Sequence, residues 1–299
     1  MRLVITGKRG QLVSSLIQAG QRLAVEVVSV GRPELDLGSS GAAVYPILAE
    51  AHPDVVVNAA AYTAVDQAEK EPELATAING SGARAVAEAA HTLGVPVIHL
   101  STDYVFDGHK ADPYTEEDPV APIGVYGTSK LAGERAVRAA TENHVIVRTA
   151  WVYSPYGKNF VRTMLHLGKT RNEIRVVADQ RGCPTYARDI AVGLAQIAQN
   201  LLQRPEDKKL RGIFHLAGTG DTNWAEFAAA IFSSTHVKLG KTPPTITPIT
   251  TAEYPTPARR PLNSRLDCSK LARVYGIQLP PWRESLEDCL QLLENELCP

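Results

Sequence analysis

Short β-rich runs alternate with amphipathic segments through the first half of the chain, and this alternation constrains the fold most. The runs are apolar and β-branched, which is typical of strands buried on both faces. They cover residues 3–6, 25–30, 54–58, 95–101 and 145–149, and the helical segments between them cover 11–19, 42–51, 72–93 and 127–141. This order predicts an α/β fold with a Rossmann-like doubly wound parallel sheet, which binds ligands beyond the C-terminal strand ends.

The pattern is looser after residue 151. Helices are predicted over 160–167, 189–202, 223–232, 269–275 and 283–297, strands over 174–177 and 213–217, and an extended, proline-dense loop over 243–261. We therefore predict an NAD(P)-binding Rossmann domain over 1–150. Residues 151–299 are predicted to form mainly a smaller C-terminal substrate-binding portion, with some elements returning to the first domain.

Bulk composition excludes several classes of function. The 299 residues are 44% hydrophobic and 21% charged, as in an ordinary globular protein. The net charge of -1 provides no general attraction to nucleic acid or to an anionic membrane. No apolar run approaches membrane-spanning length, and the first strand begins too early for a secretory signal. The cysteines lack metal-ligand spacing, so we interpret Cys183, Cys268, Cys289 and Cys298 as free thiols and expect a cytoplasmic protein.

The turn after the first predicted strand favours a dinucleotide cofactor. Gly7 and Gly10 stand between that strand and the first helix, where glycine permits a tight turn and a close backbone approach. The free N–H groups at the helix N-terminus would then face a pyrophosphate. The third glycine of the usual fingerprint is replaced by Val13, which weakens the argument for tight helix–strand packing. An ordinary strand–turn–helix connection is the alternative.

The end of the second predicted strand carries a base where an NAD-selective site usually has an acid for the ribose 2′-hydroxyl. We hypothesise that Arg32, with Lys8 or Arg9, receives a 2′-phosphate, so that NADPH is preferred over NADH. A solvated loop arginine is the alternative. Asp36 and Leu37 follow closely and would border the adenine.

Small residues follow the third predicted strand. The stretch 58–63 contains Ala60 and Ala61 before Tyr62 and Thr63, and it would let the backbone lie flat against a cofactor. An alanine-rich strand exit without a ligand is the alternative.

A tyrosine stands four residues before a lysine in the helix predicted over 127–141, so Tyr126 and Lys130 share one face. A free phenol has a pKa of about 10, and a nearby cation lowers it. Thr102, which follows the fourth predicted strand, would polarise a carbonyl. Together the three residues predict hydride delivery from a dihydronicotinamide to a carbonyl carbon, with Tyr126 as the proton donor and Lys130 as its tuner and ribose ligand. Tyr-x-x-x-Lys alone also occurs on many solvated helices.

Several stretches resemble a known family. Residues 6–10, 58–66, 101–106 and 126–130 resemble extended short-chain dehydrogenases, and 148–153, 159–160, 179–185, 254–261 and 263–264 are similar to dTDP-4-dehydrorhamnose reductases. The likeness runs over nearly the whole chain. It implies reduction of the C4 keto group of dTDP-4-dehydro-L-rhamnose by NADPH or NADH, which gives dTDP-L-rhamnose for cell-surface polysaccharide.

The resemblance also implies ligand contacts. It places Gln11, Leu12, Asp36, Leu37, Ala61, Tyr62 and Thr63 at the cofactor and Thr102, Asp103 and Trp151 at the sugar nucleotide. Arg259 and Arg260 lie in a proline-stiffened loop that could reach the diphosphate. Some relatives bind a metal at a dimer contact through a glutamate where this chain has Ser14 and Ser15. We therefore infer no required Mg²⁺ and leave a homodimer open.

Two alternatives stay open. The first is another nucleotide-sugar epimerase or reductase of the same fold; a dehydratase would need a glutamate after Asp103, where this chain has Tyr104. The second is a reductase-like regulatory subunit without catalysis, which would have no need of Thr102, Tyr126 and Lys130 together.

Overall fold

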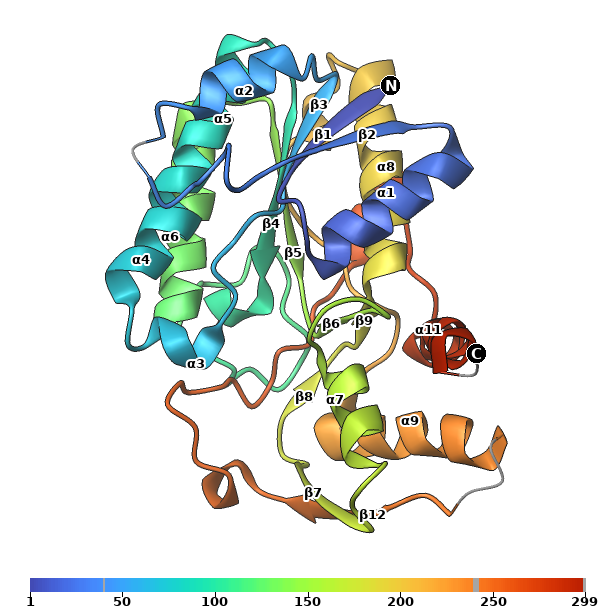
Figure 1. Ribbon diagram of the computed structural model, residues 1–299. Helices are drawn as coiled ribbons and strands as arrows, with labels where there is room; N and C mark the ends of the chain where they lie inside the picture. Colours follow the sequence, from blue (N-terminus) through green and yellow to red (C-terminus); the bar gives the residue numbers. More distant parts are fainter. Residues whose placement is uncertain (40, 239–241, 298–299) are drawn as a thin grey trace.

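The computed structural model describes residues 1–39, 41–238 and 242–297. Within them, the larger part of the chain forms a six-stranded sheet of order β10-β5-β4-β3-β1-β2, and every neighbouring pair is parallel (Figure 1). The strands are β1 (Arg2–Thr6), β2 (Glu26–Val30), β3 (Val55–Asn58), β4 (Val97–Thr102), β5 (His144–Thr149) and β10 (Gly212–His215). This confirms the predicted Rossmann-like parallel sheet. The strand order changes direction between β1 and β3, which is where such folds bind ligands.

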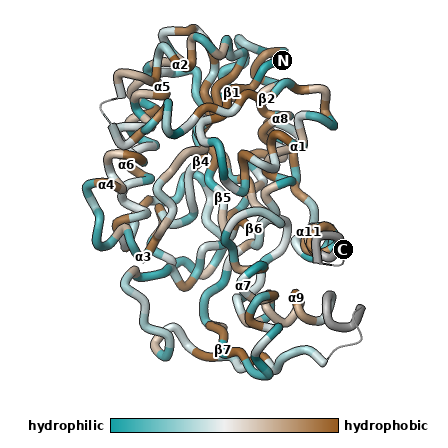
Figure 2. Tube along the Cα trace, viewed as in Figure 1, coloured by the Kyte–Doolittle hydropathy of each residue, from teal (hydrophilic) through white to brown (hydrophobic). Residues whose placement is uncertain are grey.

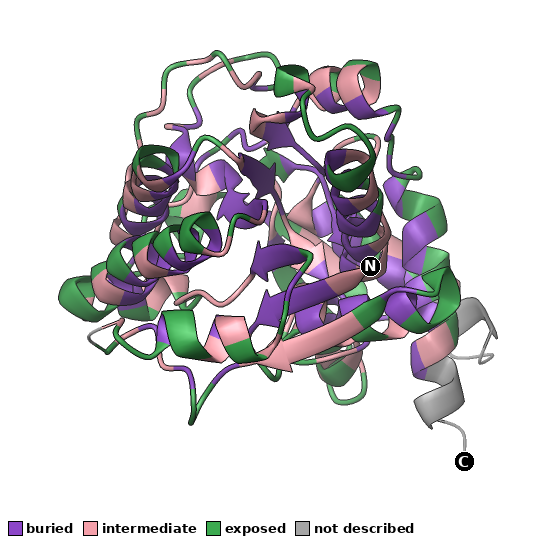
Figure 3. Cartoon of the chain, turned by 90° about the horizontal axis from the view of Figure 1, so that it is seen from above, coloured by how far each residue is buried: buried purple, intermediate pink, exposed green. Residues whose placement is uncertain are grey.

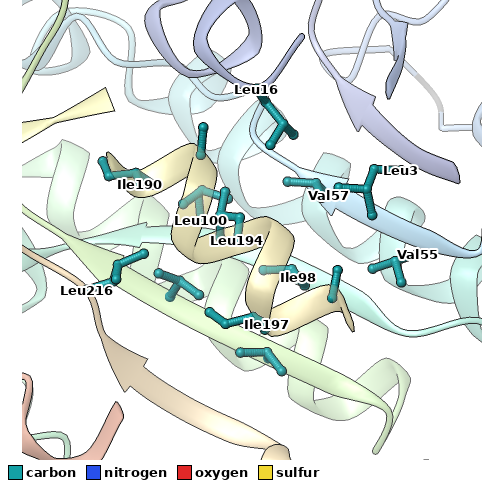
Figure 4. Packing of buried hydrophobic residues seen from close by; sticks show 14 of the residues in the cluster. Leu3, Leu16, Val55, Val57, Ile98, Leu100, Ile190, Leu194, Ile197 and Leu216 are labelled. Carbon is teal, nitrogen blue, oxygen red and sulfur yellow. The ribbon is translucent and has the colours of Figure 1, made fainter. Parts of the chain in front are cut away.

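Helices cover both faces of the sheet. On one side lie α1 (Gln11–Leu23) and α8 (Ala187–Gln203), and on the other α2 (Val44–Glu50), α5 (Ala83–Thr92) and α6 (Val125–Ala140) (Figure 1). Leu16 of α1 and Leu194 of α8 pack on Leu3, Val57 and Ile98 of the sheet (Figure 4). The inner strands β1, β3, β4 and β5 are buried between the two helical layers, whereas the edge strand β2 is half-buried (Figure 3), and β1 is mostly hydrophobic (Figure 2). This packing holds the C-terminal strand ends in fixed positions.

The helix predicted over 72–93 contains a π-helical segment. Helix α4 (Pro72–Thr76) leads into the π-helix Ala77–Gly82 and then into α5. The wide turn presents Asn79, whose amide accepts the Tyr62 N–H at 2.8 Å and donates to the Ser129 hydroxyl at 2.9 Å. Gly133 of α6 lies so close that an added Cβ would come within 2.2 Å of the Asn79 carbonyl. The π-segment therefore fixes the position of α6, the helix that carries Tyr126 and Lys130.

The second half of the chain builds a smaller aromatic core. Tyr153, Tyr186, Phe227 and Trp282 are buried between the helices α7 (Phe160–Leu167), α9 (Trp224–Lys238) and α11 (Trp282–Leu297). Strand β10 and helix α8 of the same half belong to the large sheet and its cover. A domain boundary at residue 150 stays a prediction.

The extended loop predicted over 243–261 is wrong in one part. Residues Thr245–Ile249 form β12, which pairs in parallel with β7 (Glu173–Val177). Pro248 is tolerated because β12 bonds to β7 on one side only within the described residues. The remaining short elements are α3 (Val65–Ala68), β6 (Val152–Tyr153), β8 (Arg181–Gly182), β9 (Thr185–Tyr186), β11 (Thr222–Asn223) and α10 (Ser269–Tyr275).

Cys183, Cys268 and Cys289 are free thiols, as predicted, and Cys298 lies outside the described residues. In the part of the chain that the structure describes, no helix is both long and apolar enough to cross a membrane.

Candidate active site

A cleft of about 1170 Å³ lies beyond the C-terminal ends of β1 to β5. Most of the predicted site residues line it: Gly7, Gly10, Gln11, Leu12, Arg32, Asp36, Leu37, Ala60, Ala61, Thr63, Thr102, Asp103, Tyr126, Lys130 and Trp151. The residues predicted for the cofactor and those predicted for the carbonyl therefore meet in one cleft. Tyr62 and Arg260 are not among the lining residues.

The glycine turn has the geometry that a pyrophosphate requires. Gly7 has φ of 107°, in the region that favours glycine, and its N–H donates to the Val30 carbonyl at 2.6 Å. An added Cβ on Gly10 would meet nothing within 4 Å, so this side of the turn is open. The N–H groups in the first turn of α1 have no helical carbonyl to bond. Val13, at the third fingerprint position, is buried and fills the space beside Gly7. The first helix therefore packs closely on the turn although this position is not glycine.

The side chain of Gln11 is committed to the protein itself. Its Nε2 donates to the Val152 carbonyl at 3.3 Å. Its Oε1 accepts from the Ser154 hydroxyl and from Asn159 Nδ2, both at 3.0 Å. Gln11 therefore ties the start of α1 to the segment that follows β6, and its backbone N–H is the group free to bind a cofactor.

Of the three residues predicted to bind a 2′-phosphate, Arg9 and Arg32 form no ion pair with any residue that the structure describes. Lys8 pairs with Glu34, and both side chains are largely exposed. Arg32 and Arg9 are exposed and line the cleft. Nearby, Asp36 accepts the Gly38 N–H at 2.9 Å, which shapes the loop along the same edge. Arg32 is thus the base best placed at the end of β2.

Tyr62 and Arg260 are engaged outside the cleft lining. The Tyr62 phenol donates to Glu71 at 2.6 Å, and this hydrogen bond raises the pKa of Tyr62 to about 12. Arg260 donates to Asp66 at 2.8 Å, and its charge acts on the neighbouring Tyr104 phenol, whose pKa burial raises overall. Tyr104, unlike Arg260, lines the cleft.

Thr102 and Tyr126 line the same floor of the cleft, near enough for the Thr102 hydroxyl to affect the pKa of the phenol. The Thr102 hydroxyl donates to Asp103 Oδ1 at 2.9 Å. Burial raises the pKa of Tyr126 to about 12, and the neighbouring Thr102 hydroxyl acts against this rise. The phenol is therefore protonated at neutral pH, as a proton donor must be.

The predicted lowering of the Tyr126 pKa by Lys130 is wrong for this structure. Lys130 is buried, and its Nζ donates to the Leu100 carbonyl at 2.6 Å. Burial lowers the pKa of Lys130 to about 8, and the carboxylate of Glu134 acts against this fall. Burial dominates the pKa of both partners because each has left water, an effect that spacing along a helix does not reveal.

A buried ion pair beneath Lys130 was missed in the sequence. Glu134 accepts two hydrogen bonds from Arg148, at 2.9 and 2.7 Å, and a third from the Ser101 hydroxyl at 2.5 Å. Each side chain of the pair is only 2% exposed. Glu134 stands one helical turn after Lys130, and that spacing is the one available signal. The pair joins α6 to β5 directly under the cleft floor.

Asp103 and Trp151 form the wall opposite the glycine turn. Asp103 is buried, its Oδ2 has no protein partner, and burial raises its pKa to about 6. It can accept a hydrogen bond from a ligand hydroxyl. The indole N–H of Trp151 donates to the Ser264 hydroxyl at 3.1 Å. Among the described residues no group of three or more His, Cys, Asp or Glu side chains is arranged to hold a metal ion.

A doubly wound sheet whose strand ends carry a glycine turn and a Thr–Tyr–Lys set is the architecture of the extended short-chain dehydrogenases and reductases. A family model described as the RmlD substrate binding domain matches residues 1–295, and the chain belongs to this family. Its resemblance to dTDP-4-dehydrorhamnose reductases is thereby confirmed.

Named relatives cover almost all of the chain. The dTDP-4-dehydrorhamnose reductase of Sinorhizobium fredii is 54% identical and the alignment covers 95% of each chain. That of Burkholderia thailandensis is 44% identical over 99% of this chain and 100% of its own. The crystal structure of dTDP-4-dehydrorhamnose reductase from Bacillus anthracis in complex with NADP is 38% identical, with a TM-score of 0.88 over 97% of this chain and 99% of that one.

Proposed function

We propose that this chain is an NADPH-dependent oxidoreductase that reduces the C4 keto group of dTDP-4-dehydro-L-rhamnose to give dTDP-L-rhamnose. The observation that carries the proposal is that Thr102, Tyr126 and Lys130 line the same cleft as the glycine turn. The relatives named dTDP-4-dehydrorhamnose reductase supply the substrate, and the relative in complex with NADP supplies the preferred cofactor.

The cofactor wall fits a dinucleotide. The open side of Gly10 and the free N–H groups at the start of α1 would hold the pyrophosphate, and the bases at the end of β2 would hold a 2′-phosphate. Ala60, Ala61 and Thr63 line the path from there to Tyr126 and Lys130. Bound NADPH would supply the hydride for the C4 carbon of the sugar.

Tyr126 would supply the proton. The Thr102 hydroxyl would turn from Asp103 to the substrate carbonyl oxygen, which would take a second hydrogen bond from the phenol and so be polarised. As the C4 carbon gains the hydride, the oxygen gains negative charge and removes the phenol proton. A phenol with a pKa of about 12 remains a stronger acid than an alcohol, so the transfer to the alkoxide is favourable.

Lys130 and the opposite wall complete the mechanism. With a pKa of about 8, Lys130 is mostly charged at neutral pH and would hold the nicotinamide ribose. The Oδ2 atom of Asp103 would accept a hydrogen bond from a sugar hydroxyl. The Trp151 ring would contact the apolar face of the deoxysugar.

The proposal is tested by following NADPH oxidation with dTDP-4-dehydrorhamnose, beside its UDP and GDP counterparts. We expect one NADPH consumed per sugar reduced, with the dTDP sugar preferred. An epimerase would return its substrate without continued NADPH consumption, and a regulatory subunit would bind NADPH without consuming it. Either result would overturn the proposal.

A further inference from the structure

The backbone of Trp151 adopts a conformation that tryptophan rarely takes. Its φ is 46°, in the left-handed region that favours glycine. The residue lies between β5 and β6, where the chain leaves the sheet, and it lines the cleft. A bulky residue stays in this region only when its surroundings hold it there.

Four contacts hold Trp151. Its carbonyl accepts the Thr185 N–H at 3.2 Å, and its indole N–H donates to Ser264 at 3.1 Å. Its ring is stacked on Trp224, with centroids 3.4 Å apart and planes inclined by 7°. Gly182 lies against the same indole, where an added Cβ would come within 2.3 Å of Cε2. The indole is therefore fitted between its neighbours with no room to spare.

Trp224 is itself anchored. It is the first residue of α9, which begins beside β8 (Figure 1) through the pairing of Thr222 with Gly182. Its indole N–H donates at 3.2 Å to Gln180, a buried side chain, and the Phe160 ring lies 4.7 Å away. Trp224 does not itself line the cleft as the described residues define it. It thus supports Trp151 from behind, and its own position is fixed by polar and aromatic contacts.

We propose that Trp224 and Gly182 are positioning residues that hold the Trp151 indole where the sugar of the nucleotide-sugar substrate binds. This inference rests on the proposed function. Trp224 supplies the surface on which the indole rests, and Gly182 is required because any side chain there would displace the ring. Displacement of the ring weakens its contact with the sugar but leaves the glycine turn, Tyr126 and Lys130 untouched.

The test compares Trp224→Leu, Trp224→Phe and Gly182→Ala with the unaltered protein. For Trp224→Leu and Gly182→Ala we expect the KM for dTDP-4-dehydrorhamnose to rise about tenfold, the value of an aromatic contact of about 1.4 kcal/mol. The kcat should fall much less, and the Kd of NADPH should not change. Trp224→Phe keeps a ring in the stack and should recover most of the loss.

The matched control is Trp282→Phe. Trp282 is buried in the same aromatic core and contacts Phe227 edge-on at 5.5 Å. This control should lower the Tm without raising the KM for the sugar. A folded Trp224→Leu and a folded Gly182→Ala with unchanged KM would overturn the inference, and so would a control that raises KM equally.

Crystal structures of the same variants separate this inference from the proposed function. We expect the Trp151 ring to leave its place in Trp224→Leu and in Gly182→Ala. If the unaltered protein fails to oxidise NADPH with this sugar, the proposed function is wrong. If the Trp151 ring keeps its place in the variants, the positioning role is wrong, whatever the outcome of the activity assay. Should Trp224→Leu not fold, Gly182→Ala and Trp224→Phe give the same two readouts.

Discussion

The two walls of the cleft are built in different ways. The cofactor wall (residues 6–13, 30–33, 35–37, 59–61 and 63) consists of turns that directly follow β1, β2 and β3, and it includes several glycine and alanine residues. The substrate wall (Asp103 and Trp151) depends on side chains held from far along the sequence. The bond from Trp151 to Ser264 spans 113 positions.

The difference separates the effects of substitution. A change in the cofactor wall should alter constants for NADPH, and a change in or behind the substrate wall should alter constants for the sugar. The floor that joins the walls (Thr102, Tyr126 and Lys130) faces both ligands, so changes there should alter the rate. Substitution of one residue at a time tests whether that residue acts as part of the wall or of the floor in which it lies.

The largest effect is expected at the floor. Tyr126→Phe removes the proton donor but keeps the ring, so kcat should fall by about 10²- to 10⁴-fold. The Kd of NADPH, measured by fluorescence titration, should stay nearly unchanged because the glycine turn is intact. Unchanged turnover would remove Tyr126 from the mechanism.

Tyr104→Phe is the matched control for that variant. The two rings are neighbours, 5.5 Å apart and edge-on, and both line the cleft. The Tyr104 phenol lies near Arg260 and is not the predicted proton donor, so its removal should cost far less in kcat. An equal loss in the two variants would show that ring packing, and not proton donation, was being measured.

The second prediction concerns pH. Lys130 carries its charge below its pKa of about 8 and loses it as the pH rises through that value. Since the charged form would hold the nicotinamide ribose, kcat/KM should be level below about pH 8 and fall about tenfold per pH unit above it. Lys130→Met should be slow at every pH and lack this alkaline limb. A limb that survives in Lys130→Met would assign the titration to another group.

The cofactor wall could be predicted from the sequence because its parts are adjacent in the chain. Gly7 and Gly10 stand between a recognisable strand and helix, and parallel strands bring their ends to one edge of the sheet. The same rule predicted that Thr102 and Tyr126 lie at that edge. Helix periodicity likewise predicted α7 and α10 to the residue.

The supports of the site could not be predicted, because they join residues that no local pattern relates. In the sequence, nothing distinguishes Glu134 from an exposed acid on a helix. Only the fold places Arg148 of β5 beside it. Trp224 reads as part of a helix start until its ring is found on Trp151. The predicted direction of the Tyr126 pKa shift is wrong for a related reason. Burial depends on the assembled fold and not on the spacing of residues along a helix.

A smaller effect is expected from substitution of Arg260, at the edge of the substrate wall. We expect Arg260→Ala to raise the KM for the sugar nucleotide about tenfold, because the positive charge beside Tyr104 that would attract the diphosphate is lost. The ratio of kcat/KM for NADPH and NADH should not change. Arg259→Ala is the control, since this exposed neighbour has the same charge in the same loop. If both variants raise KM equally, loop charge alone is responsible.

The smallest expected effect lies in the cofactor wall, at Arg32. This side chain is exposed at the end of β2, where solvent weakens any contact with a 2′-phosphate. Arg32→Ala should therefore reduce the preference for NADPH over NADH only about fivefold, through a higher KM for NADPH, and leave the KM for the sugar unchanged. Arg9→Ala removes a second exposed base from the same cleft and should change the preference less. If the unaltered protein prefers NADH, or if Arg32→Ala changes the KM for the sugar instead, the division between the two walls does not hold at this residue.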